Sequence, residues 1–203
     1  MDWVATAAGR SGRPSVASLS FGGHYLASIN TAAANLISSG VTTVVAAGNT
    51  NIDAANVSPA STPSVITVGA STITDAKAFY SNYGAVLGVW APGTQRVDIE
   101  ITETVSYFLS GSDVISTWNN NGTEMLSGTS MAAPYVAGYA AYLLTLDSSL
   151  TPATVASTIE SQSLKNVLSG IRKFIDGPTF ITLNSLSISI AAGTTNALLN
   201  NGL

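Results

Sequence analysis

The sequence predicts an α/β fold in which a parallel sheet is flanked by helices. Short apolar segments rich in β-branched residues alternate with longer segments whose apolar residues recur at helical spacing. Such alternation is typical of parallel strands joined by crossover helices. The chain has 203 residues, of which 46% are hydrophobic, so it is long enough for one domain or a large part of one.

The expected elements follow one another along the chain. Apolar, β-branched segments predict strands at residues 15–21, 41–47, 64–70 and 85–89. Helical spacing of apolar residues predicts helices at residues 24–39, 131–146 and 152–162. Gly40 is expected to end the first helix, and Thr151-Pro152 to begin the last, because Pro is favoured at the first helical position. Two β-prone segments, 95–113 and 172–189, do not fit this plan.

Composition excludes several classes of function. The net charge is −4 and no Lys/Arg cluster occurs, so a nucleic-acid partner is not expected. There is no Cys and only one His, His24, which excludes a thiolate nucleophile and the usual zinc sites. No apolar run is long enough to predict a membrane span. The sequence therefore predicts no cofactor and no metal.

The sharpest chemical feature is the segment Ser127–Pro134, which leads into an Ala-rich helix. A Ser at a helix N-terminus lies beside unpaired N–H groups and the positive end of the helix dipole. An oxyanion formed by attack of Ser130 on a carbonyl would be stabilised by both. Pro134 is expected in the first turn, where its missing N–H breaks no helical bond. The alternative is that Ser130 only caps the helix.

Two further segments place polar groups or free backbone at strand ends. Asn49 follows the strand that ends in Ala46-Ala47-Gly48, where its amide could donate to an oxyanion, or could simply favour a turn. The segment Ser18–Gly23 leads from a strand into Gly-Gly, which leaves backbone accessible to an extended peptide. An ordinary strand followed by a loop explains this segment equally well.

Together these segments resemble the subtilase family of serine proteases, most closely its proteinase K-like fungal branch. Residues 127–134 resemble the family's nucleophile motif, residues 46–49 its oxyanion-hole segment, and residues 18–23 its substrate-binding strand. Three further motifs, at residues 58–65, 81–84 and 91–94, occur in the family's order. The resemblance implies a subtilisin-like parallel sheet flanked by helices and covers nearly the whole chain except the two β-prone segments.

The resemblance also implies a mechanism. Ser130 would attack a peptide carbonyl and form an acyl-enzyme, while the Asn49 side chain and the Ser130 N–H hold the oxyanion. The substrate cleft would be lined by six residues: Ser20, Phe21, Gly22, Ala46, Ala47 and Gly48. The substrate would be a polypeptide, and the full-length family member would be secreted with a signal peptide and a propeptide.

The sequence departs from the family in three respects. The family orders its triad Asp, His, Ser, and neither the Asp nor the His motif occurs here, so the N-terminal strands of the fold are expected to be missing. His24 follows the substrate strand, where the family has no catalytic His, and is expected to be an exposed residue at a helix start. Gly88 stands where a family calcium site has an Asp, so calcium is not predicted.

These departures leave alternatives open. Segments 95–113 and 172–189 are insertions relative to the family, either translated introns or genuine surface loops. The chain is then a partial subtilase domain over residues 1–203, expected to be inactive by itself, or a non-catalytic remnant or mis-spliced product. An α/β-hydrolase is disfavoured because Ala132 replaces the second Gly of its motif and no His follows Ser130.

Overall fold

The computed structural model describes residues 1–94, 114–119, 121–169 and 197–199. Its centre is a six-stranded sheet with the order β1-β3-β5-β6-β10-β9. Its main strands are β1 (Ser15–Leu19), β3 (Val41–Ala46), β5 (Ile66–Ser71) and β6 (Val89–Pro92), which pair in parallel. The predicted parallel sheet is therefore confirmed.

Two short strands complete the sheet at its far edge. β10 (Ala197–Leu198) pairs in parallel with β6, and β9 (Leu164–Lys165) pairs antiparallel with β10. At the opposite edge lies β1, whose one partner among the described residues is β3. The first predicted strand is therefore an edge strand of this sheet.

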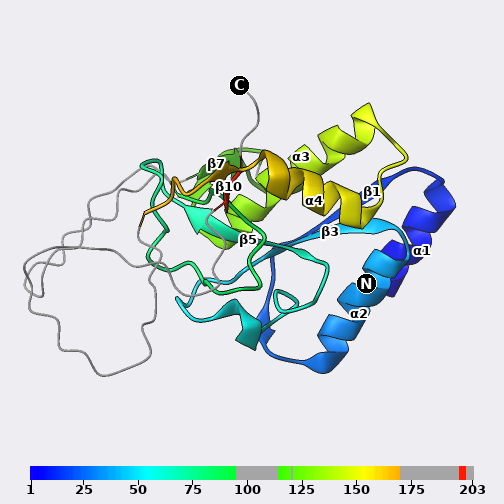
Figure 1. Ribbon diagram of the computed structural model, residues 1–203, viewed down its shortest axis with the longest axis horizontal. Helices are drawn as coiled ribbons and strands as arrows, with labels where there is room; N and C mark the ends of the chain where they lie inside the picture. The colour runs from blue at the N-terminus through cyan, green and yellow to red at the C-terminus, as the bar shows by residue number, and fades with distance from the viewer. Residues whose placement is uncertain (95–113, 120, 170–196, 200–203) are drawn as a thin grey trace, which may run out of the picture.

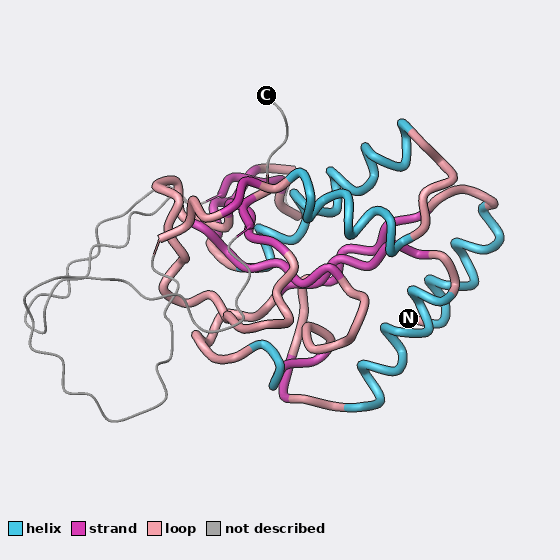
Figure 2. The backbone as a smooth tube through the Cα atoms, viewed as in Figure 1, coloured by secondary structure: helices cyan, strands magenta, loops and turns pink. Residues whose placement is uncertain are grey.

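Helices cover both faces of the sheet (Figure 2). On one face lie α3 (Thr129–Leu146) and α4 (Pro152–Gln162), and on the other lie α1 (Asp2–Ser11) and α2 (Ala27–Ser38) (Figure 1). The η1 turn (Ala54–Asn56) and a two-stranded ladder of β2 (Gly23–His24) and β4 (Val57–Ser58) also cover the sheet face opposite α3.

The alternation of side chains along β3 explains why both faces are covered. Val44 and Ala46 pack with α3 and α4, whereas Val45 and Ala47 pack against Trp90 and the η1 segment on the other face. All six residues of β3 are buried, as expected for a central parallel strand. The apolar run that predicted this strand thus contributes to two separate cores.

Most predicted elements are confirmed, with shifts at their ends. Gly40 follows α2 with a φ of 85°, a left-handed conformation that suits glycine. Thr151 caps α4 by accepting a hydrogen bond from the Thr154 N–H. The strand predicted at 85–89 is wrong by several residues: Leu87 N–H closes a turn on the Gly84 carbonyl, so β6 begins only at Val89.

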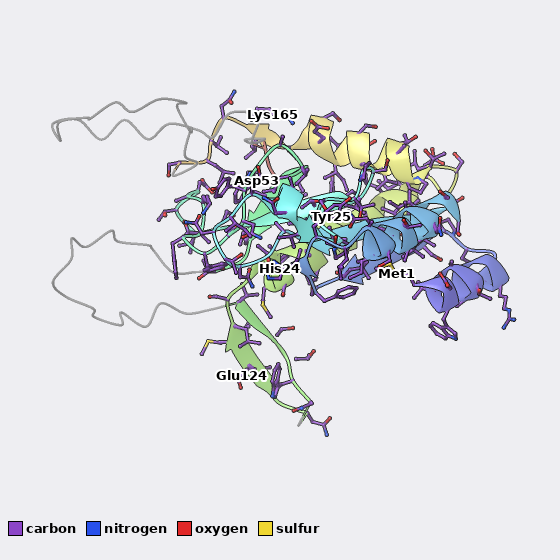
Figure 3. All side chains as sticks on the ribbon, turned by 90° about the horizontal axis from the view of Figure 1, so that it is seen from below. Met1, His24, Tyr25, Asp53, Glu124 and Lys165 are labelled. Atoms are coloured by element: carbon purple, nitrogen blue, oxygen red, sulfur yellow. The ribbon has the colours of Figure 1, made fainter. Side chains whose placement is uncertain are left out.

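Three features were not predicted. α1 has no buried residue of its own and packs its partly buried apolar side on α2 and β1, so its pattern was weak. The β2–β4 ladder is too short to give a periodic signal. β7 (Val114–Thr117) and β8 (Thr123–Leu126) form an antiparallel hairpin that projects from the body and carries Glu124 (Figure 3). The predicted insertions at 95–113 and 172–189 lie outside the described residues.

Candidate active site

Ser130 lies in the first turn of α3, at the carboxyl-end edge of the parallel sheet. The helix starts at Thr129 after an N-cap at Gly128, and Ser130 is half-buried. N–H groups in a first helical turn have no carbonyl four residues earlier within the helix, so they are available to an anion. The positive end of the dipole of α3, an 18-residue helix, also lies at this position and favours a negative charge there. The predicted helix start was two residues too late, because Thr129 and Ser130 are already helical.

Asn49 reaches this helix end from the loop after β3. Its Oδ1 accepts hydrogen bonds from the Thr129 N–H at 2.9 Å and from the Thr129 hydroxyl at 2.7 Å. Because the oxygen is anchored to the helix end, the Nδ2 group remains as a hydrogen-bond donor beside it. A Cβ added at Gly128 would lie 3.2 Å from this Nδ2, so a side chain there would crowd the donor.

Thr129 orients the Asn49 amide, a role that sequence reasoning did not assign. Its hydroxyl donates to Asn49 Oδ1 and accepts from the Gly48 N–H at 3.1 Å. The same side chain therefore fixes the backbone before Asn49 and the amide itself. Its position next to Ser130 was the available signal, but the sequence could not show that the hydroxyl points toward β3 rather than solvent.

Ser20 brings the end of β1 to the same place. Its hydroxyl donates to the Ser130 carbonyl at 2.9 Å, and the Ser130 hydroxyl makes a long contact of 3.5 Å with the Ser20 carbonyl. Because β1 and β3 are parallel neighbours, their ends meet at one sheet edge. The structure therefore joins three predicted site residues, Ser20, Asn49 and Ser130, through the first turn of α3.

The end of β6 holds the turn that precedes α3. Gly128 N–H donates to the Gly93 carbonyl at 3.0 Å, and the Ser127 hydroxyl donates to Thr94 Oγ1 at 2.9 Å. A Cβ at Gly93 would come within 2.5 Å of the Ala70 Cβ, so only glycine permits this close approach. Segments following β1, β3 and β6 thus all contact the start of α3.

The remaining predicted cleft residues make no described hydrogen bond to Ser130. Ala46 and Ala47 are buried in the two cores, and the Ala47 N–H and carbonyl are bonded to Val68 and Asn82, so Ala47 offers no free backbone group to a ligand. Phe21 is 52% exposed. Gly22 lies against β4, where a Cβ would come within 3.3 Å of Val57 Cγ1. The structure brings Ser20, Gly48 and Asn49 to the helix end, and no described hydrogen bond links Phe21 or Gly22 to it.

A second buried amide, Asn82, supports the loop that carries Asn49. Its Nδ2 donates to the Ala47 carbonyl at 2.8 Å, and its Oδ1 accepts from the Thr50 N–H, the Thr50 hydroxyl and the Ile52 N–H, each at 3.1 Å. Gly48 has a φ of 103°, and a Cβ there would lie 2.4 Å from Asn82 Nδ2. The sequence singled out residues 81–84 as a motif but assigned Asn82 no role.

Pro134 corrects one prediction. It is the sixth residue of α3 and so lies in the second turn, where a regular residue would donate its N–H to the Ser130 carbonyl. The missing N–H therefore does remove a helical hydrogen bond, contrary to the prediction, which assumed a later helix start.

His24 is exposed, as predicted, but it lies in β2 opposite Val57 rather than at a helix start (Figure 3). Within the described ranges, no group of three or more His, Asp or Glu side chains could hold a metal ion. The helices of the described part of the chain include none that is both long and apolar enough to span a membrane.

Comparison with known proteins tests the resemblance that these motifs indicated. The sequence model of the subtilase family matches residues 1–184. The chain belongs to the subtilase family. This subtilase is 46% identical over 173 residues to "Cuticle-degrading protease" of Metarhizium anisopliae, covering 84% of this chain and 40% of that protein. It is also 46% identical over 158 residues to "Proteinase R" of Parengyodontium album, covering 76% of this chain and 36% of that protein.

The fold is shared with a solved subtilase structure. A cold adapted subtilisin-like serine proteinase superposes with a TM-score of 0.74 and 35% identity, over 98% of this chain and 57% of that protein. The predicted subtilisin-like fold is therefore confirmed. The subtilase chain spans well under half the length of these two curated relatives.

Proposed function

We propose that this chain forms part of a serine endopeptidase in which Ser130 is the nucleophile. One observation carries the proposal: the half-buried Ser130 lies in the first turn of an 18-residue helix, beside an Asn49 amide whose oxygen is anchored and whose nitrogen is left to donate. When the Ser130 hydroxyl attacks a peptide carbonyl, the oxyanion that forms on that carbonyl oxygen would meet two donors, the Asn49 Nδ2 group and the Ser130 N–H. The products of the first step are an acyl-enzyme on Ser130 and a free amine.

The substrate of this proposed enzyme is a polypeptide. The end of β1 lies beside the nucleophile, where Ser20–Gly22 would pair with an extended peptide. Ala46–Gly48, whose Ala47 and Gly48 backbone groups are already hydrogen-bonded, would line the cleft without pairing. The names of the matched relatives describe proteases, which agrees with this substrate class. Secretion and a propeptide are part of the same proposal, by analogy with the family.

Within these 203 residues the general base is missing. The sequence contains one His, and His24 is held on the outer β2–β4 ladder by its pairing with Val57. A Ser nucleophile without a base retains only the residual catalysis of the oxyanion donors and substrate binding. We therefore propose that the chain is a partial subtilase domain that has no measurable endopeptidase activity in this form.

The first experiment tests the complete protein encoded by the spliced transcript. Its sequence upstream of Met1 should contain an Asp and a His in family motifs, and the protein should hydrolyse casein. Ser130→Ala should abolish this hydrolysis. A transcript that encodes no upstream catalytic segment would instead support the alternative, a non-catalytic remnant.

A second experiment addresses Asn49 in that complete protein. Asn49→Ala should lower kcat by roughly 10²–10³-fold with little change in KM, because the amide contacts charge that exists mainly in the transition state; this range was measured on subtilisin itself. Asn35→Ala, an exposed Asn on α2, is the matched control and should leave kcat unchanged. An unaltered kcat in Asn49→Ala would remove Asn49 from the mechanism.

A phosphonate probe separates the enzyme from the remnant in the chain as it stands. Such a probe labels a Ser only when a base activates it. We expect no labelling of Ser130 in the 203-residue chain and rapid labelling in the complete protein. Labelling of the short chain that is lost in His24→Ala would show that His24 acts as the base after all.

A further inference from the structure

The Ser130 carbonyl is the one place in the first turns of α3 where the helix cannot supply its usual hydrogen bond. In an α-helix each carbonyl accepts from the N–H four residues later. For Ser130 that residue is Pro134, which has no N–H. The carbonyl of the proposed nucleophile therefore needs a partner from outside the helix.

Ser20 is that partner. Its hydroxyl donates to the Ser130 carbonyl at 2.9 Å across a separation of 110 residues. Ser20 comes directly after β1, so the bond ties the helix to the end of the edge strand. Since Ser20 is exposed, water could replace the lost bond at little cost in stability. What water could not replace is the fixed direction of the bond.

Together with Asn49, Ser20 holds the nucleophile segment at both of its ends. Asn49 Oδ1 accepts from the Thr129 N–H, on the N-terminal side, and the Ser20 hydroxyl donates to the Ser130 carbonyl, on the C-terminal side. Between these two anchors lie the Ser130 N–H and the Ser130 side chain. Rotation of this segment would move both the attacking oxygen and one oxyanion donor.

We propose that Ser20 is a positioning residue for Ser130. Its hydroxyl donates the hydrogen bond to the Ser130 carbonyl that Pro134, which lacks an N–H, cannot donate. This role is separate from the backbone of Ser20, which the proposed function assigns to substrate pairing. The inference rests on the proposed function for its effect on turnover, but the hydrogen bond itself can be measured without any activity.

The kinetic test uses the complete protein. Ser20→Ala should lower kcat about tenfold with KM nearly unchanged, since loss of one orienting hydrogen bond misplaces the nucleophile without removing a substrate contact. Ser20→Thr, which keeps the hydroxyl, should restore most of the turnover. Ser38→Ala is the matched control, because the Ser38 hydroxyl likewise donates to a helical carbonyl, that of Ala34 at 3.0 Å, in α2 on the sheet face opposite α3.

Pro134→Ala makes the test specific. An Ala at this position supplies the missing N–H to the Ser130 carbonyl, so Ser20→Ala should cost clearly less in the Pro134→Ala background than in the wild type. Equal losses in the two backgrounds would overturn the proposal, because they would show that the Ser20 side chain acts by some other route.

The structural test uses the 203-residue chain. Ser130-Met131 is its only Ser-Met pair, so labelling Ser with ¹³C at the carbonyl and Met with ¹⁵N isolates one amide–carbonyl NMR signal. Ser20→Ala should shift the Ser130 carbonyl resonance, and Ser38→Ala should not. An unshifted resonance would refute the hydrogen bond. Absence of hydrolysis by the complete wild-type protein would instead contradict the proposed function and leave this structural result standing.

Discussion

Asn82→Ala should destabilise the fold more than its small change in volume suggests. Asn82 is fully buried, and its amide connects the end of β3 to the loop that carries Asn49. The substitution leaves the Ala47 carbonyl without its 2.8 Å donor, and Ala47 is also fully buried. An unsatisfied buried group of this kind costs about 1–3 kcal/mol. Thr50 and Ile52 are exposed, so water can partly replace their bonds, and we expect a total loss of roughly 2–4 kcal/mol.

Asn82→Asp gives a sharper version of the same test. It keeps the size of the side chain and its acceptor oxygen but replaces the Nδ2 donor with a second oxygen facing the Ala47 carbonyl. Burial and this repulsion should raise the pKa of the introduced carboxyl above its unfolded value. A carboxyl with a raised folded pKa favours the folded state while protonated, so the variant should be more stable at acidic than at neutral pH.

Urea denaturation followed by far-UV circular dichroism measures both effects. Asn35→Ala, exposed on α2, is the control and should change the free energy of unfolding by less than about 0.5 kcal/mol. A loss below about 1 kcal/mol in Asn82→Ala, or an Asn82→Asp variant that is most stable at neutral pH, would refute the argument that this amide holds the loop.

Three further predictions concern packing, pH and the sheet edge. Gly69→Ala should lower the melting temperature, because the new Cβ would lie 2.5 Å from the ring of the fully buried Trp90. Neighbouring groups would have to move, at a cost of about 1–3 kcal/mol in the free energy of unfolding. An unchanged melting temperature would contradict this prediction. The Ser149 hydroxyl and N–H donate to the Asp147 carboxylate and lower its pKa, so their contribution to stability is present above the usual Asp range and disappears as pH falls through the lowered pKa. Ser149→Ala should raise that pKa in an NMR titration, and a pKa that does not move would show that the hydroxyl contributes nothing. Because β1 is an edge strand with exposed Ser18, the chain should self-associate in light scattering and Ser18→Lys should reduce this; a monodisperse unmodified chain would refute it.

The sequence determined the class of fold because the relevant signals are local. Apolar β-branched runs predicted β1, β3 and β5, and helical spacing with Gly40 and Thr151 at the ends predicted α2 and α4. These signals depend on period, capping and backbone conformation, which neighbouring residues set among themselves. Where the signal was weak, as in α1 and the β7–β8 hairpin, the element was missed because its apolar residues have few buried partners.

The same motifs identified which side chains to follow, namely Ser130, Asn49 and Ser20. They could not give the contacts between them, which join residues up to 110 positions apart. Only the tertiary structure decided that Thr129 turns the Asn49 oxygen inward, that Asn82 anchors the loop below it, and that Ser20 takes the place of the N–H absent from Pro134. The physical reason is that a parallel sheet gathers the ends of strands distant in sequence at one edge, and hydrogen bonds formed there depend on directions that no local pattern specifies.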